Sequence, residues 1–192
     1  MIRTGRLLLR QWRAEDRDPF ARMGQDPEVM EFFPSLLTRE ESDAGADRAE
    51  AHIAANGFGF WAVEVPGEAP FAGFIGLNSP WFEAHFTPCI EIGWRLARPF
   101  WGRGYATEGA AAALEFGFTK LGLEEIVSFA VTTNVRSVAV MRRIGMKFSE
   151  EFDHPMIEEG HCLRRHVLYR IAKTGWRPDD KTGAIPLSPV AA

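Results

Sequence analysis

Residues 89–121 read CIEIGWRLARPFWGRGYATEGAAAALEFGFTKL, and this stretch decides the fold. Apolar and other side chains alternate from Ile90 to Leu96, which predicts a half-buried strand. Apolar residues then recur at helical spacing over 106–121, which predicts a helix with one buried face. The run WGRGYA at 101–106 lies between them. A strand, a glycine-rich turn and a helix start form an anion-binding arrangement, because glycines permit positive φ and the helix N-terminus offers unpaired N–H groups.

The glycines at 102 and 104 do not belong to either of two common phosphate-binding motifs. The P-loop requires GxxxxGK followed by Ser or Thr, and the chain has no such run. The dinucleotide fingerprint GxGxxG requires a third glycine at the position of Thr107. On spacing alone, a simple turn without a ligand remains open.

A longer part of the same stretch matches a known family. RPFWGRGYATEGA at 98–110 resembles the pyrophosphate-binding loop of the GNAT superfamily of N-acetyltransferases, and in detail its ribosomal-protein N-terminal, or Rim-type, branch. Gly104 and Ala106 occupy the last two defined positions of the superfamily pattern, and Trp101 stands where Gln or Arg is usual, a departure that the Rim-type branch shares. The resemblance extends from residue 4 to about 173. It implies an α+β fold of the GNAT type, with a mixed, mostly antiparallel, splayed sheet and helices on both faces.

The apolar pattern and the turn residues predict the other elements along the chain. We expect strands over residues 6–12, 58–65, 71–77, 90–96, 125–131, 146–152 and 163–172, and helices over 15–24, 38–56, 106–121 and 134–144, with a helical turn at 26–29. Residues 1–173 are expected to form one acetyltransferase domain. Residues 174–192 are rich in Pro, Gly and Asp, and we expect a loosely ordered tail or an arm onto a partner subunit.

Composition excludes several classes of protein. The net charge of −4 gives no electrostatic case for nucleic acid as the main partner. No apolar run reaches the roughly 18 residues of a membrane span, and the N-terminus lacks a signal-peptide pattern, so we expect a cytoplasmic protein. Two cysteines make neither a disulfide framework nor a paired zinc signature. A homodimer is possible, although no feature demands one.

The resemblance implies acetyl-CoA as co-substrate and a primary amine, either a protein N-terminus or a small amine, as acceptor. The amine would attack the thioester directly in a ternary complex. Backbone N–H groups from Gly102 to Thr107 would hold the pyrophosphate, and Arg103 and Arg98 could add charge. The backbone of Ile92–Leu96 would pair with the pantetheine arm. The expected donor-binding residues are Ile92, Trp94, Leu96, Trp101, Gly102, Arg103, Gly104, Tyr105, Ala106, Thr107, Asn134 and Ser137.

A second motif, Asn134-x-x-Ser137, opens the predicted helix 134–144. From position alone, Asn134 is a helix N-cap. In Rim-type enzymes the matching Asn binds the pantetheine arm, and the matching Ser lies near the sulfur as the proposed acid. Many other GNAT enzymes place a tyrosine at the position of Met141. The resemblance therefore implies either that Ser137 donates the proton or that the thiolate leaves without a dedicated acid.

The acceptor amine needs a base, because free amines are mostly protonated at pH 7. Glu91 is the strongest candidate, since strand alternation places it with Gly93 and Arg95 on one face and Ile92 and Trp94 on the other. An ion pair or a surface position is the plain alternative for Glu91.

Other candidates are weaker. Glu108 lies in the first helical turn and is expected to be structural. His154 belongs to a region that borders the acceptor site in the family, but we expect it in a surface loop, and the pair His161-Cys162 is poor evidence for a metal site. Three aromatic residues are expected in an acceptor pocket, an interface or the core: Trp81, Phe82 and Phe86. A different class, a non-catalytic acyl-CoA-binding or interaction module, stays open because Met141 replaces the tyrosine.

Overall fold

One mixed eight-stranded sheet carries the fold in the computed structural model, which describes residues 1–177. Its strands lie in the order β1-β2-β3-β4-β5-β6-β8-β7. They are β1 Ile2–Arg3, β2 Leu8–Arg10, β3 Phe60–Val65, β4 Ala69–Asn78, β5 Glu91–Leu96, β6 Glu125–Val131, β7 Lys147–Asp153 and β8 Arg165–Ala172. The described neighbours pair antiparallel, except that β5 and β6 run parallel. The predicted α+β class with a mixed, mostly antiparallel sheet is confirmed.

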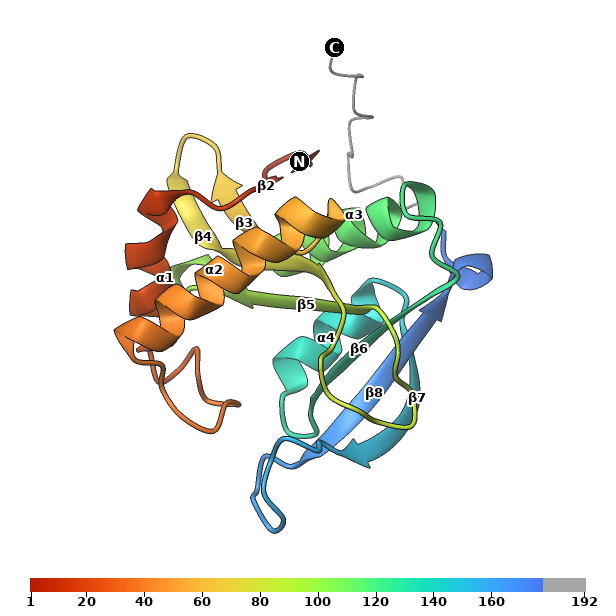
Figure 1. Cartoon of the computed structure of the whole chain (residues 1–192). Coiled ribbons are helices and arrows are strands. Elements are labelled where there is room, and N and C mark those ends of the chain that lie inside the picture. The colour runs from red at the N-terminus through yellow and green to blue at the C-terminus, as the bar shows by residue number, and fades with distance from the viewer. Residues whose placement is uncertain (178–192) are drawn as a thin grey trace.

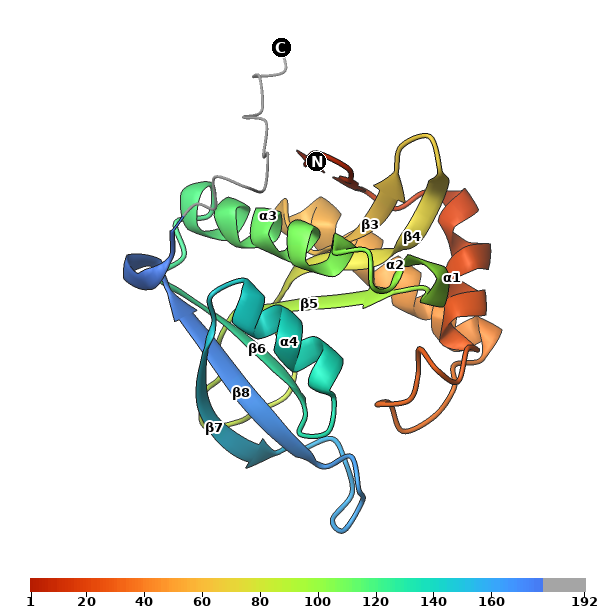
Figure 2. The same ribbon diagram turned by 180° about the vertical axis from the view of Figure 1, so that it is seen from behind.

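Helices cover both faces of this sheet. They are α1 Arg17–Gly24, α2 Arg39–Asn56, α3 Tyr105–Thr119 and α4 Val135–Arg143, with short 3-10 turns at Ala14–Asp16, Arg98–Phe100 and Lys173–Gly175. α1 and α2 lie on one face (Figure 1), and α3 and α4 lie on the other (Figure 2). None of the helices within residues 1–177 has the length and apolar character needed to cross a bilayer.

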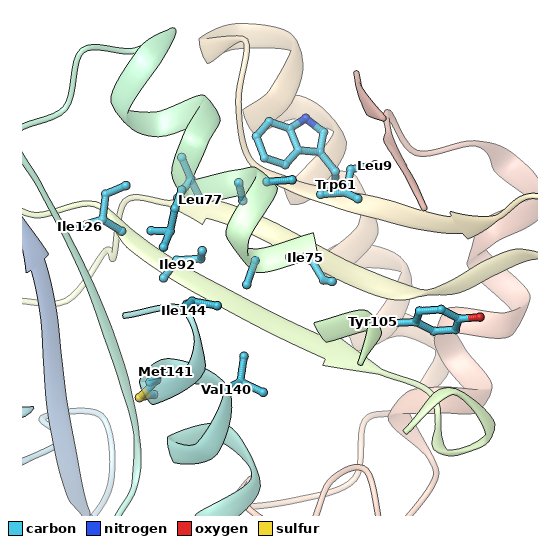
Figure 3. Packing of buried hydrophobic residues seen from close by; sticks show 14 of the residues in the cluster. Leu9, Trp61, Ile75, Leu77, Ile92, Tyr105, Ile126, Val140, Met141 and Ile144 are labelled. Atoms are coloured by element: carbon cyan, nitrogen blue, oxygen red, sulfur yellow. The ribbon is translucent and has the colours of Figure 1, made fainter. Parts of the chain in front are cut away.

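The main core lies between the sheet and the α3–α4 layer. Ile92 of β5 belongs to it together with Leu77 of β4 and Met141 and Ile144 of α4 (Figure 3). The predicted helical stripe is confirmed at its centre, because Leu114 and its neighbours one turn away are almost fully buried. The even-numbered side chains of β5 therefore enter this core, whereas its odd-numbered side chains lie on the α1–α2 face.

The sheet opens between β5 and β6. β4 and β5 pair in continuous register from Gly73↔Leu96 to Asn78↔Glu91. β5 and β6 instead share a single bridge, Glu91↔Val127, and then diverge (Figure 1). The predicted splay is thus present, and it starts one residue beyond Glu91.

The N-terminal elements differ from expectation. The predicted strand 6–12 is shortened to β2, and β1 was not predicted. The cause is a tight turn, in which Thr4 N–H donates to the Leu7 carbonyl at 2.9 Å and Thr4 Oγ1 accepts from Leu7 N–H at 2.9 Å. The predicted helix 15–24 begins as a 3-10 turn, and residues 26–29 form turns instead of a helix.

Helix α2 is where expected, but its inner face is not. Thr38 and Glu41 form the predicted capping box, with Thr38 Oγ1 accepting from Glu41 N–H at 3.1 Å. The apolar face that the sequence indicates for this helix is mostly alanine, namely Ala44, Ala51 and Ala55 with Ile53. The three alanines are exposed, whereas Ser42 and Ala46 are buried. Alanine is small enough to lie on either side of a helix, so an alanine-rich helix does not reveal its buried face by pattern.

The two predicted strands at the end of the domain are present as β7 and β8, with their starts shifted by one and two residues. The first residues of the predicted tail still pack on the domain, since the ring of Trp176 lies 5.3 Å from that of Phe118 in α3. The rest of the predicted tail, residues 178–192, lies outside the described residues.

Candidate active site

The glycine-rich turn before α3 presents backbone N–H groups that have no hydrogen-bond acceptor within residues 1–177. Gly102 and Gly104 have φ of +72° and +81°, in the left-handed region that L side chains rarely adopt. Gly104 is the N-cap of α3, and its carbonyl accepts from Glu108 N–H at 3.0 Å. Within residues 1–177 the backbone N–H groups of 102–107 have no hydrogen-bond acceptor. Unpaired N–H groups at a helix N-terminus fit the oxygens of a pyrophosphate.

Glu108 anchors this turn. Its carboxylate accepts from Thr4 Oγ1 at 2.6 Å and from the backbone N–H and Nε of Arg6 at 2.8 and 2.7 Å. Arg6 in turn donates through Nη1 to the Arg103 carbonyl at 2.9 Å. These contacts give Glu108 the structural role expected for it, and they occupy both of its oxygens.

The arginines of the turn are paired with carboxylates from distant segments. Arg103 makes a two-point ion pair with Glu68, with Nη2 donating to Oε2 at 2.8 Å. This contact lowers the pKa of the Glu68 carboxyl. Arg98 pairs with Glu28. To bind a phosphate, each arginine would exchange its carboxylate for the ligand.

Two aromatic residues fix the turn to the sheet. Tyr105 is buried, and the guanidinium groups of Arg6 and Arg103 lie 4.8 and 4.9 Å from its ring centroid. Trp101 donates from Nε1 to the Leu96 carbonyl at 2.7 Å. The turn is therefore held on both sides, which keeps its free N–H groups in one orientation.

The backbone of β5 presents one edge to the gap in the sheet. Hydrogen-bonded pairs alternate along an antiparallel ladder. Ala97 N–H donates to the Ala72 carbonyl at 2.9 Å, so the odd-numbered residues of β5 bond to β4. The N–H and C=O groups of Ile92, Trp94 and Leu96 therefore face β6. Because the ladder to β6 ends beside the first of these, the backbone of Trp94 has no strand partner within residues 1–177 and can pair with an extended ligand arm.

The start of α4 faces the same gap. Asn134 is the N-cap, and its Oδ1 accepts from Ser137 N–H at 3.1 Å. The Ser137 hydroxyl lines the cavity and has no hydrogen-bond partner within residues 1–177. Met141, one turn on, is 1% exposed and packs in the core. The cap role of Asn134 is thus present, and the side chain of Ser137 is free to contact a ligand.

These groups surround one cavity of about 1450 Å³ that runs through the opening in the sheet. The turn 100–108 and the start of α4 line one side of it. Glu91 and Arg95 line the other, together with three phenylalanines: Phe33, Phe60 and Phe74. Both the odd-numbered and the even-numbered residues of β5 border the cavity, so it reaches both faces of this strand.

Glu91 has the properties of a general base. Its carboxylate lines the cavity, and Asn78 Nδ2 donates to Oε1 at 3.1 Å. Burial raises the pKa of the Glu91 carboxyl to about 7, and the Asn78 hydrogen bond opposes this only in part. A carboxyl with a pKa near the working pH can both take and release a proton.

Arg95 was not predicted as a site residue, although strand alternation places it with Glu91 on the odd-numbered face of β5. Its guanidinium lies 3.9 Å from the ring centroid of Phe33 and 5.3 Å from that of Phe74. Ser128 was also missed; its buried hydroxyl donates to the Ile92 carbonyl at 2.9 Å and bridges the strands where they part. The spacing of residues carries no signal for either contact, because the partners come from separate elements.

His154 lies in the loop directly after β7, as expected, but its ring is partly buried instead of being on the surface. Its ring lies 4.9 Å from that of His166 and 4.6 Å from that of Phe82, and both histidines line the cavity. Burial and the neighbouring His166 lower the pKa of His154 to about 4, so the ring is neutral at pH 7. His166 Nδ1 lies 3.0 Å from the Arg164 carbonyl, which assigns the proton to that nitrogen.

The remaining aromatic candidates differ in burial. Phe82 and Phe86 are buried in a small core with Phe129 and Phe152, so they pack the fold. Trp81 is 79% exposed.

The thiol of Cys89 is a poor nucleophile at neutral pH. Burial and the nearby Glu91 carboxylate raise the pKa of the Cys89 thiol to about 11. Cys162 is exposed beside His161, in the loop before β8. In the described part of the chain, no three His, Cys, Asp or Glu side chains gather as metal ligands would.

Comparison with known proteins gives one family. A family model described as "Acetyltransferase (GNAT) domain" matches residues 6–147. The FsC-acetyl coenzyme A-N(2)-transacetylase of Aspergillus fumigatus is 32% identical over 190 residues, covering 91% of this chain and 77% of that protein. A GNAT-family acetyltransferase from Bacillus anthracis has a crystal structure that superposes with a TM-score of 0.75 at 25% identity, covering 90% of this chain and 98% of that one.

A putative ribosomal-protein-serine acetyltransferase from Vibrio cholerae also superposes, with a TM-score of 0.71 over 89% of this chain and 96% of that one. Its identity of 16% shows a shared fold alone. The comparisons therefore point to the superfamily and do not single out the Rim-type branch.

Proposed function

The chain belongs to the GNAT acetyltransferase family, and we propose that it moves the acetyl group of acetyl-CoA onto a primary amine by direct attack, with both substrates bound. The family uses acetyl-CoA as its donor. The observation that carries the finer proposal is one cavity shared by free N–H groups at 102–107, the open edge of β5 and the carboxylate of Glu91.

The residues present fit the donor. Unpaired N–H groups at the start of α3 match a pyrophosphate, and the unpaired backbone of Trp94 matches the amide groups of a pantetheine arm. When bound, acetyl-CoA supplies an activated acetyl thioester. We assign Asn134 and Ser137 to the end of this arm, because they open α4 on the opposite side of the gap.

Glu91 would take the proton of the acceptor amine, directly or through water. With a pKa of about 7, its carboxyl is roughly half ionised at neutral pH. Asn78 orients the carboxylate by a hydrogen bond to one oxygen. The new C–N bond forms as the C–S bond breaks, and the departing sulfur takes a proton either from the Ser137 hydroxyl, which regains one from water, or from water directly. Glu91 then releases the amine proton to solvent. No protein nucleophile is required, which agrees with the raised pKa of the Cys89 thiol.

Several features support an N-acyltransferase over the alternative of a non-catalytic acyl-CoA-binding module. The relative from Aspergillus fumigatus is named for transfer from acetyl coenzyme A to N(2). A buried carboxylate of raised pKa beside the donor site has no use in a binding module. The W-G-x-G-Y-A-T-E run supports the Rim-type branch, and a protein N-terminus and a small amine remain the two candidate acceptors.

The test is a thiol-release assay with acetyl-CoA and a panel of primary amines and N-terminal peptides, with the product identified by mass spectrometry. We expect one acetyl group on nitrogen for each thiol released. Thiol release that is independent of every amine, at the rate of thioester hydrolysis, would contradict the proposal.

A further inference from the structure

Arg95 is a partly buried arginine that lines the cavity and has no carboxylate partner within residues 1–177. Its Nη1 contacts only the weak acceptor Sδ of Met30, at 3.5 Å. Its Nε is buried and has no hydrogen-bond partner. Aromatic rings of Phe33 and Phe74 flank its charge. Cation–π contacts stabilise the charge, but they provide no hydrogen-bond acceptor for the buried Nε.

Arg10, an almost fully buried arginine of the same chain, shows how a structural guanidinium obtains its hydrogen-bond acceptors. Arg10 is 3% exposed, and Asp16 accepts two hydrogen bonds from it, at 2.7 and 2.9 Å. Glu64 accepts a third at 2.8 Å, and the Pro70 carbonyl a fourth at 2.6 Å. Burying a cation is costly unless anions and acceptors replace water. By that comparison, the position of Arg95 lacks an anion.

The cavity around Arg95 does not suit a polycation. Of the carboxylates in residues 1–177, Glu91 and Glu108 line it, and Glu108 is already bound by Arg6 and Thr4. An acceptor with several positive charges would meet only Glu91, and it would meet the charge of Arg95 as well. Burial lowers the pKa of Arg95 to about 10, which still leaves it charged at pH 7.

Glu91 and Arg95 lie on the same face of β5, four residues apart, so their Cα atoms are roughly 13 Å apart. Gly93 lies between them, and the ring of Phe60 covers it, since a Cβ there would be 3.0 Å from that ring. The floor between the two charged side chains is thus flat and apolar.

We propose that the acceptor is a primary amine that also carries a carboxylate, and that Arg95 binds this carboxylate while the amine lies at Glu91. The acceptor lies along β5 against the ring of Phe60 that covers Gly93, with its two ends at the two charged side chains. This assignment rests on the proposed acetyl transfer. It selects amino-carboxylates from the possible acceptors and rejects polyamines.

The test compares acceptors that differ only in the anion: 4-aminobutanoate and 6-aminohexanoate against their carboxamides, phenylalanine against phenylalaninamide, and spermidine as the polycation. A charge-assisted two-point hydrogen bond predicts a ratio of kcat/KM, acid over amide, of roughly 10 to 150 for the best-fitting pair. A ratio near one for every pair, or a preference for spermidine, would overturn the assignment.

Variants separate recognition from a structural role. Arg95→Met should bring the acid-to-amide ratio close to one, and Arg95→Lys should keep part of it, because lysine retains the charge without the planar fork. The matched control is Arg136→Met, since Arg136 also lines the cavity and stacks on Trp101 but is paired with Glu31. If Arg95 only held Phe33 in place, Arg95→Met would lower both rates together and leave the ratio unchanged, which would sink the proposal.

A binding measurement keeps this outcome distinct from failure of acetyl transfer. Calorimetric titration of 6-acetamidohexanoate and its amide into the CoA-saturated protein requires no turnover. Tighter binding of the acid, lost in Arg95→Met, supports the anion site even if no acceptor is turned over. Equal binding of acid and amide overturns it even if acetyl transfer is found.

Discussion

The two walls of the cavity meet at β5, but they are built in different ways. The donor wall is mostly one contiguous run, the turn 100–108 and the first turn of α3, and its ligand groups are backbone N–H. The acceptor wall takes Phe33 from the loop before α2, Phe60 from β3, Phe74 from β4 and Arg95 from β5. The first depends on local backbone geometry, and the second on side chains that only the folded sheet brings together. Acceptor preference can therefore change by substitution without disturbing the donor site.

Glu91 lies where the two walls meet, and its removal should have the largest effect. Glu91→Gln should lower kcat by roughly 10² to 10⁴, the usual contribution of a general base. The wild-type kcat should rise with pH through about 7 as this carboxyl ionises, and the variant should lack that inflection. An unaltered pH–rate profile would exclude Glu91 as the base. Calorimetric binding of acetyl-CoA should survive the change, which controls for folding of the donor wall.

Glu91→Gln should lower activity but raise the free energy of unfolding above pH 7. The folded-state pKa of Glu91 is raised from 4.5 to about 7, so the folded protein holds a proton that the unfolded chain releases, and the free energy of unfolding falls as pH rises from about 4 to 7. The full difference corresponds to an upper limit of roughly 3 kcal/mol. Glu91→Gln should remove this part of the pH dependence in urea unfolding and be more stable than wild type at pH 8. Parallel curves for the two proteins would contradict the raised pKa.

Ser137 belongs to the donor side but contributes through its side chain. Ser137→Ala should lower kcat by about 10-fold or more. This effect is small for the loss of a general acid, because a thiolate is already a good leaving group. The dissociation constant of acetyl-CoA should change little, because the hydroxyl has no hydrogen bond that holds the loop. Stopped-flow thiol release separates the two quantities. An unchanged rate would remove its role as acid.

Gly104 tests the donor wall alone. An alanine at its φ of +81° is strained, and its Cβ would lie 3.3 Å from Arg6, so the N–H groups should lose their alignment. Gly104→Ala should weaken acetyl-CoA binding about 10-fold, roughly the contribution of one charge-assisted hydrogen bond. Gly122→Ala is the matched control, because Gly122 has a φ of +68° with open space around it. Equal losses of affinity in both variants would mean that the turn binds nothing.

Phe33 tests the acceptor wall, with the smallest expected effect. It is 40% exposed, so Phe33→Ala should leave the fold intact while removing one ring from Arg95. The KM of the acceptor should rise a few-fold, in line with a partly exposed cation–π contact. The KM of acetyl-CoA should stay the same. A change in the KM of acetyl-CoA instead would show that the two walls are coupled.

The same division decides what the sequence could predict. The turn at Gly102 and Gly104, the helix cap at Asn134 and the strand face of Glu91 depend on neighbours in the chain, so the sequence predicts them. Their assignment to donor binding and proton transfer came from the family resemblance. Arg95 stood on the predicted face, but the absence of a carboxylate partner is a tertiary property.

Two further residues show the same limit. The sequence did not reveal that His154 is partly buried, because the aromatic rings around it come from β6, β7 and the loop after β4. Ser128 reads as one more strand position, since its acceptor lies on the strand across the gap.

Calorimetric titration of acetyl-CoA into the wild-type protein, with NAD as the comparison, tests the central claim most directly. We expect one site with a dissociation constant in the micromolar range, within the usual span of substrate affinities, and no heat from NAD. We also expect weaker binding to Gly104→Ala and full binding to Phe33→Ala. No binding of acetyl-CoA, or equal binding of NAD, would mean that the turn before α3 is not a donor site, and the assignment of the cavity would fall with it.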